Sequence, residues 1–414
     1  MKEEILAQLD HPKELERLYR KNNTLFKQSF DILYPELQGN SIAEFWNSRL
    51  HYEREEFNWG SSKELLFIIG GCFVAGIIAK LPSIFHWNED FFYPRNIGFV
   101  VFPLLIAYFS WKKALSKKQM GATALLIIVS LIFINFLPDV HMSDTLLLSC
   151  IHLPIILWFL LLYSYAGTVK NNLEGRLDFL KFNGDLVVMT ALILIAGALL
   201  SGLTVGLFSL IGFNIEKFYF ENIIVFGLAG APILGTYLVQ SNPQLVGKVS
   251  PVIAKIFSPL VLVMLVIYLI AMIYSGKDPY NDRQFLMIFN ALLLGVMCLI
   301  FFNAADTAAE SKTRAGIWIL FLLSIVTIIV NGIALSAILF RIAEWGFTPN
   351  RAAVLGGNGL ILINLFMVGI QLYKVLFRKA NIDTVGKAIA LYLPIYLGWA
   401  AVVTFFFPFL FGFK

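Results

Sequence analysis

Five polar side chains lie inside long apolar stretches of the sequence, where they could contact a ligand or one another. They are His152, Asn290, Asn331, Asn358 and Asn364. A polar group in an apolar environment lowers stability unless it forms a hydrogen bond. Amides in such positions commonly join neighbouring helices, each contributing about 0.6 kcal/mol. The alternative is a shared polar cavity, so we take these five residues as its candidate lining.

Two of these residues have neighbours that favour competing interpretations. Asn358 lies in "LGGNG", where three glycines could expose backbone groups to a ligand or permit close helix packing, and packing is favoured. His152 precedes Pro154 by two residues. It could relay protons or contact a ligand, but a neutral ring bonded to the backbone carbonyls that the proline leaves without a donor is favoured.

A short polar connection, "RIAEWGFTPNR", separates two apolar stretches at residues 341–351. Arg341 and Glu344 are three residues apart, a spacing that allows an ion pair on one face of a helix. Gly346 suits a left-handed helix end, and the Thr-Pro pair that follows is typical of the next helix start. Arg351 near that start opposes the helix dipole, which predicts a carboxylate or another anion beside it. The three charged residues form a candidate anion or ion-pair cluster.

Motifs of soluble enzymes are absent from the sequence. It has no phosphate-binding P-loop, no HExxH zinc motif and no GxSxG nucleophile motif. Its three cysteines lie in apolar stretches at irregular spacing, which is typical of core or lipid-facing residues. We therefore assign no catalytic residue, no cofactor and no metal ligand, and a protein without enzymatic activity is favoured.

The composition determines the surroundings in which these residues must work. Hydrophobic residues make up 58% of the 414 residues and charged residues 14%, whereas soluble chains have about 45 to 50% and about 25%. This excess of apolar residues predicts an integral membrane protein. The net charge of +5 forms no clustered basic face, so nucleic acid is not an expected partner.

Each spanning helix needs about 20 mainly apolar residues, and the sequence after residue 60 contains eleven such stretches. They cover approximately residues 64–82, 96–112, 119–137, 144–166, 185–212, 218–240, 254–275, 283–304, 315–342, 350–375 and 385–411. The second stretch is short and has Pro103 in its middle. The predicted fold is an all-α, polytopic transmembrane helical bundle over residues 61–414.

Charges in the connections predict the orientation of this bundle. With the N-terminus in the cytoplasm, the inner connections hold 15 lysines and arginines and the outer connections hold 8. Positive residues concentrate on the cytoplasmic side of membrane proteins. An odd number of spans then leaves the C-terminus outside. Without the second stretch the bias would reverse, so the charges also favour eleven helices.

Residues 1–60 differ in composition from the rest and predict a small cytoplasmic segment of amphipathic helices. Leucines and aromatic residues recur at three- and four-residue spacing from Leu15 to Leu33, as in an amphipathic helix. A second such helix is expected from Ser41, with Asn40 or Ser41 as its cap. The segment is expected to pack on the membrane helices, lie on the lipid surface or bind a protein partner.

Two longer stretches of the sequence resemble a bacterial family of multi-pass membrane proteins. They read "FSPLVLVMLVIYLIAMIYSGKDPYNDRQFLMIFNALLLG" and "RIAEWGFTPNRAAVLGGNGLILINL". The region 185–375 is similar to proteins grouped as domain of unknown function 4153. The resemblance rests on a Ser-Pro at a helix start, an Asp-Arg before the next helix and an aromatic-Gly-x-Thr-x-x-Arg turn. It implies a bacterial inner membrane and no particular activity.

Three functional classes follow from these features. The leading expectation is a transporter-like or permease-like protein with a polar cavity among the eighth to tenth helices. The first alternative is a scaffold, sensor or assembly factor whose N-terminal segment binds a protein partner. A third is a membrane enzyme acting on a lipid or a lipid-linked phosphate, gripped by the arginines of the 341–351 connection. Membrane lipids are partners in all three classes.

Overall fold

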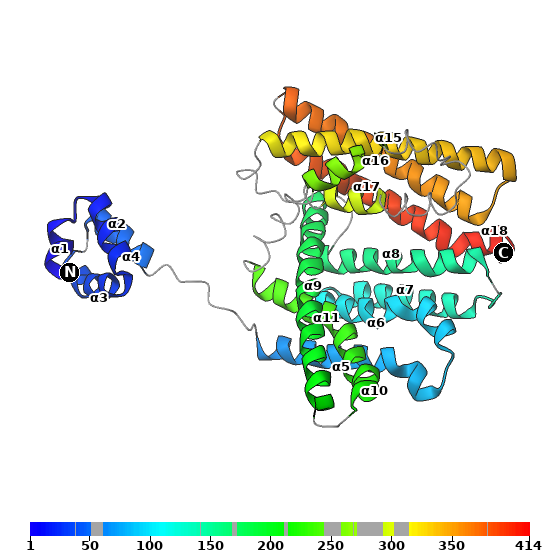
Figure 1. Ribbon diagram of the computed structural model, residues 1–414, viewed down its shortest axis with the longest axis horizontal. Coiled ribbons are helices and arrows are strands. Elements are labelled where there is room, and N and C mark those ends of the chain that lie inside the picture. Colours follow the sequence, from blue (N-terminus) through cyan, green and yellow to red (C-terminus); the bar gives the residue numbers. More distant parts are fainter. Residues whose placement is uncertain are drawn as a thin grey trace. The chain divides into compact units, whose positions relative to one another are not determined.

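A computed structural model of the chain shows two compact units, Met1–Asn58 and Trp59–Lys414. The structure describes residues 1–37, 39–50, 61–140, 142–167, 172–210, 214–243, 258–267, 269–270, 293–301, 314–378 and 380–414. Every regular element within these ranges is helical (Figure 1). The all-α fold class is therefore confirmed.

The N-terminal unit consists of short helices. They are α1 (Lys2–Ala7), α2 (Pro12–Lys21), α3 (Asn23–Leu33), a 3₁₀ turn (Tyr34–Glu36) and α4 (Ser41–Leu50). The amphipathic stretch that the sequence joins into one helix is interrupted at Asn22, whose side chain accepts a hydrogen bond from the backbone N–H of Leu25 over 3.0 Å. This cap starts α3. Asn40 caps α4 in the same way, as the sequence predicts.

An aromatic core holds these four helices together. Phe26, Phe30 and Trp46 are almost fully buried, and the ring centroids of Phe26 and Trp46 are 5.1 Å apart. Aromatic side chains bury large apolar areas, which allows a small unit to form a core of its own. Phe45, next to Trp46 on α4, lies outside this core and is 61% exposed.

The second unit contains, in the ranges that the structure describes, nine helices that are long and apolar enough to cross a membrane. They are α5 (Ser62–Phe85), α6 (Glu89–Lys112), α7 (Lys117–Phe136), α8 (Asp144–Ala166), α9 (Leu173–Leu210), α10–η2–α11 (Glu216–Phe218, Tyr219–Ile224 and Val225–Ser241), α15 (Arg314–Trp345), α16 (Pro349–Arg378) and α17–η4–α18 (Asp383–Ala401, Val402–Phe406 and Phe407–Leu410). The protein is thus a multi-pass helical membrane protein.

These nine helices correspond to nine of the eleven predicted stretches. The second stretch forms a continuous helix from Glu89, capped by Asn88, so the prediction placed its start too late. Of the predicted seventh and eighth stretches, only Ser258–Ile267 and residues 269–270 and 293–301 are described as helical, and the rest lies outside the described residues. Helix α9, which corresponds to the fifth predicted stretch, begins at Leu173, within a predicted connection. It starts this early because its first turns bury apolar residues such as Phe179 and Phe182.

Contacts between helix ends define two faces of this unit. Lys112 at the end of α6 bonds Glu64 at the start of α5, and we call this end the first face. Ser143 at the start of α8 donates to the carbonyl oxygen of Phe413, and we call that end the second face. The turn between α15 and α16 lies at the second face, because Phe347 stacks on Phe411.

The helices of this unit pack in two connected groups. In one group, α15 packs on α16, α16 on α17, and α17 on α8; in the other, α5 packs on α11 and α6 on α8. Helix α9 contacts α11, α17 and α8, and Figure 1 shows it running across the direction of α6, α7 and α8. The candidate cavity residues on α15 and α16 therefore belong to the first group.

Candidate functional site

Asn331 and Asn358 join the two helices α15 and α16. Both side chains are buried, and Asn331 Nδ2 donates to the carbonyl oxygen of Asn358 over 3.0 Å. Within the described part of the chain, Asn331 Oδ1 is buried without a hydrogen-bond partner. A buried acceptor of this kind costs free energy unless a water or a ligand bonds it. The pair is therefore both a helix-joining contact and an open hydrogen-bonding position.

Asn364 extends this polar contact to the neighbouring helix. It is fully buried, and its Nδ2 donates to the hydroxyl oxygen of Tyr396 on α17 over 3.1 Å. Asn364 is six residues from Asn358, or about 9 Å along the helix axis. Three of the four predicted asparagines therefore lie in the interfaces of α15, α16 and α17, a region that we call the polar layer.

The glycines of "LGGNG" have a packing role in the polar layer. A Cβ atom on Gly356 would lie 2.0 Å from the Trp399 ring of α17, far closer than atoms can approach. Around Gly359, by contrast, no atom lies within 4 Å of such a Cβ. The close-packing interpretation is therefore confirmed at Gly356, where the absence of a side chain lets the indole contact α16.

Trp399 also leaves a donor without a partner. Its Nε1–H is buried and donates to no acceptor among the residues that the structure describes. The indole nitrogen lies 3.9 Å from the position that a Gly357 Cβ would take, so it faces α16. Gly357 directly precedes Asn358 in the sequence. Oδ1 of Asn364 is likewise buried without a partner among the described residues. The polar layer thus presents one unpaired donor and two unpaired acceptors, all uncharged.

A π-helical turn continues this region toward the second face. The segment η4, Val402–Phe406, interrupts the last spanning helix and contains Thr404, whose side chain is fully buried. Ser149 of α8 donates to the carbonyl oxygen of Thr404 over 2.9 Å. Single π-helical turns inside α-helices occur often at functional sites. Apolar periodicity does not distinguish such a turn from an ordinary helix, so the sequence analysis missed it.

His152 does not join the polar layer in the described structure. Its ring is half-buried on α8, and Nδ1 lies 2.9 Å from the carbonyl oxygen of Leu148, one turn earlier. A carbonyl oxygen can only accept a hydrogen bond, so this contact places the ring proton on Nδ1. Asn290, the remaining predicted cavity residue, lies outside the described residues.

The turn between α15 and α16 has the predicted helix end and helix start. Gly346 adopts a positive φ of 80° and α16 starts at Pro349, with Thr348 Oγ1 accepting from the backbone N–H of Arg351. A left-handed glycine followed by a capped helix start is the expected chemistry of a tight helical hairpin. This part of the polar connection is therefore structural.

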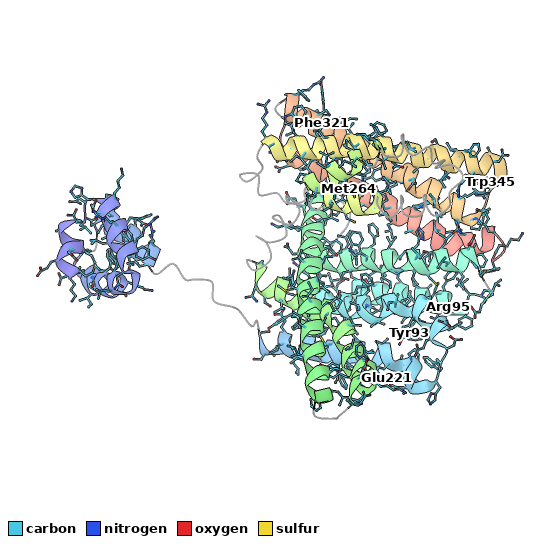
Figure 2. All side chains as sticks on the ribbon, in the orientation of Figure 1. Tyr93, Arg95, Glu221, Met264, Phe321 and Trp345 are labelled. Carbon is cyan, nitrogen blue, oxygen red and sulfur yellow. The ribbon has the colours of Figure 1, made fainter. Side chains whose placement is uncertain are left out.

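Both arginines of this turn lie over one tryptophan. The guanidinium carbons of Arg341 and Arg351 are 5.5 Å and 5.7 Å from the ring centroid of Trp345, distances that allow cation–π attraction. Figure 2 shows Trp345 at the end of α15. Glu344 is exposed, and no ion pair links it to Arg341 in the described part of the chain.

Arg351 has partners that explain its position without an anion. Its Nη1 donates to the carbonyl oxygens of Trp345 and Gly346, over 2.9 Å and 2.6 Å. Those carbonyls end α15, where the helix dipole is negative and a cation is favoured. The sequence argument considered only the helix that Arg351 begins, whereas the guanidinium reaches back to the helix that precedes it.

The sequence analysis missed three polar contacts elsewhere in the membrane unit. At the second face, buried Arg95 pairs with Asp139 over 3.3 Å (Arg95 is labelled in Figure 2), and Asn96 and Asn135 exchange hydrogen bonds of 3.0 Å and 2.9 Å. At the first face, Lys112, Glu64 and Tyr108 bond one another. Most of these residues lie near helix ends, where hydropathy does not separate buried polar side chains from exposed ones.

The site contains no recognisable metal-binding arrangement in the ranges that the structure describes, where no three His, Cys, Asp or Glu side chains come together. Between Gly316 and Phe340 of α15, between Ala352 and Tyr373 of α16, and between Ala388 and Leu410 of the last helix, the sequence has no charged residue. The polar layer can therefore offer hydrogen bonds from uncharged groups.

Comparisons with protein families, with curated proteins and with solved structures find no match to this chain. The resemblance to domain of unknown function 4153 therefore stays a prediction.

Proposed function

We propose that this protein is a transporter-like or permease-like protein of the bacterial inner membrane, in which the polar layer of α15, α16 and α17 contacts a small polar solute. The observation that carries the proposal is the buried Asn331 Oδ1, which has no hydrogen-bond partner in the described structure. The unpaired Nε1–H of Trp399 adds a donor in the same group of helices. A solute or water file with both donors and acceptors would satisfy these groups.

The proposed orientation has the first face in the cytoplasm. Basic residues at that face include Lys112, Lys113, Lys117 and Lys118, on the short connection from α6 to α7. Such short, positively charged connections are typical of the cytoplasmic side. The N-terminal unit would then be cytoplasmic and the C-terminus outside.

A scaffold or sensor is the second candidate function, and the N-terminal unit favours it. This unit has its own aromatic core and its own ion pairs, for example Glu16 with Arg49 over 2.8 Å. A module of this kind can bind a partner regardless of whether the membrane unit moves a solute. An enzyme acting on lipid phosphate has less support, because Arg351 already bonds two backbone carbonyls.

Proteoliposomes containing the purified protein test the proposal directly. Shrinking and reswelling under osmotic gradients of small polar solutes should be faster than in empty liposomes for at least one solute. Asn331→Leu should slow this flux, because it removes an unpaired acceptor, whereas Leu339→Ala, on the lipid-exposed side of α15, should not. Rates equal to those of empty liposomes for every solute and ion tried would contradict transport and favour the scaffold.

A further inference from the structure

A groove on the N-terminal unit lies between α2 and α4 and has a volume of about 370 Å³. Its lining includes Lys13, Glu16 and Arg20 of α2 together with Phe45, Trp46 and Arg49 of α4. Both helices belong to the same compact unit, so the groove does not depend on how the two units are placed. The proposed solute passage does not use it, and the scaffold alternative names no surface for its partner.

Positive charge dominates the lining of this groove. It has three cationic side chains, on Lys13, Arg20 and Arg49, against the single carboxylate of Glu16. The carboxylate is shared, since Glu16 lies 2.8 Å from Arg20 Nε and 2.8 Å from Arg49 Nη2. Each guanidinium has five N–H donors, so both retain donors for another acceptor. The groove therefore favours an anionic ligand.

The contacts around Arg49 hold its guanidinium in place before any ligand binds. Its central carbon is 4.8 Å from the Trp46 ring centroid and 5.3 Å from the Tyr19 ring centroid. The ion pair to Glu16 fixes the same group from the other side. A guanidinium fixed in this way loses less side-chain entropy when it binds a carboxylate.

Phe45 adds an apolar position to the rim of the groove. Its ring is 61% exposed, whereas the adjacent Trp46 is 2% exposed and belongs to the core. Exposed aromatic residues next to cations are typical of protein-binding surfaces, where aromatic and arginine side chains contribute most of the affinity. The combination suits a ligand with carboxylates flanking an apolar side chain.

We propose that this groove binds an acidic segment of a protein partner, with its carboxylates on Lys13 and Arg49 and an apolar side chain on Phe45. Charge complementarity selects this occupant over an anionic lipid surface. Residues 1–50 contain seven Lys and Arg but eight Asp and Glu, whereas lipid-binding segments carry a cluster of basic residues. The positive charge is local to the groove, which fits a localised acidic ligand.

The test uses the full-length protein in detergent micelles and a short fluorescent peptide built from glutamate and phenylalanine. Binding is followed by fluorescence anisotropy. The matched control is the same peptide with glutamine in place of glutamate. The acidic peptide should bind, the glutamine peptide should bind at least roughly tenfold more weakly, and added salt should weaken the binding of the acidic peptide.

Variants then locate the binding surface. Lys13→Glu should weaken binding of the acidic peptide roughly tenfold, because it places like charge against the peptide. Phe45→Ser should also weaken it, and neither residue belongs to the buried core of the unit. Arg17→Glu is the control, since Arg17 is a cation of α2 outside the groove lining and its side chain is 81% exposed.

Three results would overturn the proposal. The first is no binding of the acidic peptide. The second is equal binding by the protein with Lys13→Glu or Phe45→Ser. The third is binding of phosphatidylglycerol vesicles by the full-length protein that Lys13→Glu abolishes while the peptide does not bind, which would assign the groove to a lipid surface. Solute flux in proteoliposomes does not bear on any of these outcomes.

Discussion

The N-terminal unit and the polar layer of the membrane unit achieve tight packing in different ways. In the N-terminal unit, large rings fill the centre, with Phe26 in contact with both Phe30 and Trp46 and charged pairs outside them. In the polar layer, the Trp399 ring packs against Gly356, and the Asn331 amide donates to the backbone carbonyl of Asn358.

The solvent explains this difference. In water, burial of apolar surface drives association, so large side chains stabilise the small unit. In lipid, the surrounding tails are as apolar as leucine, so helices associate through close fit and polar contacts. Truncating a large side chain should therefore lower stability most in the N-terminal unit. Adding a small side chain should lower stability most in the polar layer.

Trp46→Ala should produce the largest effect. Removing a buried aromatic side chain costs about 3 to 5 kcal/mol, which approaches the whole stability of so small a unit. Hydrogen exchange measured by mass spectrometry should show lost protection over residues 1–50 and unchanged protection in α5 to α8. Phe45→Ala, its exposed neighbour, is the matched control. Lost protection in the membrane helices would mean that the two units do not fold independently.

Gly356→Ala should produce the next largest effect. The new methyl group would overlap the Trp399 ring, and overpacking of this kind costs about 1 to 3 kcal/mol. The melting temperature of the detergent-solubilised protein should fall, while Gly359→Ala, in the same motif, should leave it unchanged. Adding Trp399→Leu should restore part of the loss. An equal effect of both glycine changes would show that helix propensity, and not the fit to Trp399, determines the stability.

Arg351→Ala tests the helix end of the membrane unit. The change removes two hydrogen bonds to the carbonyls of Trp345 and Gly346 and should cost about 1 kcal/mol. Glu344→Ala should change the melting temperature much less, because no ion pair to Arg341 is lost in the described structure. If Arg351→Ala leaves stability unchanged and only impairs function, the anion-binding interpretation of the sequence would be supported instead.

The pH dependence of the N-terminal unit should show the smallest effect. The hydrogen bond from Arg20, with the charge of Arg49, lowers the pKa of Glu16 below its usual value of 4.5. A lowered pKa in the folded state stabilises the unit above the unfolded pKa, and this contribution is lost as the pH falls through the folded pKa. Glu16→Gln should therefore destabilise the unit near neutral pH and have no effect in strong acid. A destabilisation that persists in acid would assign the loss to packing.

The sequence predicts the membrane unit well where long apolar stretches lie between capping residues. Ser61, Ser116 and Ser143 each cap a predicted spanning helix. Helix starts that combine charge with burial were missed, because hydropathy averages over neighbours. Arg95 illustrates this, since its burial depends on Asp139, which lies 44 residues away in the chain.

The candidate site could be predicted only in part. Asn331, Asn358 and Asn364 stand out as amides in apolar stretches, and the structure places them between α15, α16 and α17. Tyr396, which bonds Asn364, and Trp399, which packs on Gly356, did not stand out, because aromatic residues are common in spanning helices. Which side chain lies opposite which depends on the pairing of distant helices, and the periodicity of a single helix contains no information about that pairing.

Reactivity of a cysteine at position 331 tests the central claim most directly. In a variant that lacks Cys72, Cys150 and Cys298, Asn331→Cys should react with a small water-soluble thiol reagent, because only a hydrated thiol ionises readily. Ile329→Cys, at a position 51% exposed on the lipid-facing side of α15, should not react. If Lys117→Cys reacts but Asn331→Cys is as inert as Ile329→Cys, the polar layer is dry and the transport proposal is contradicted.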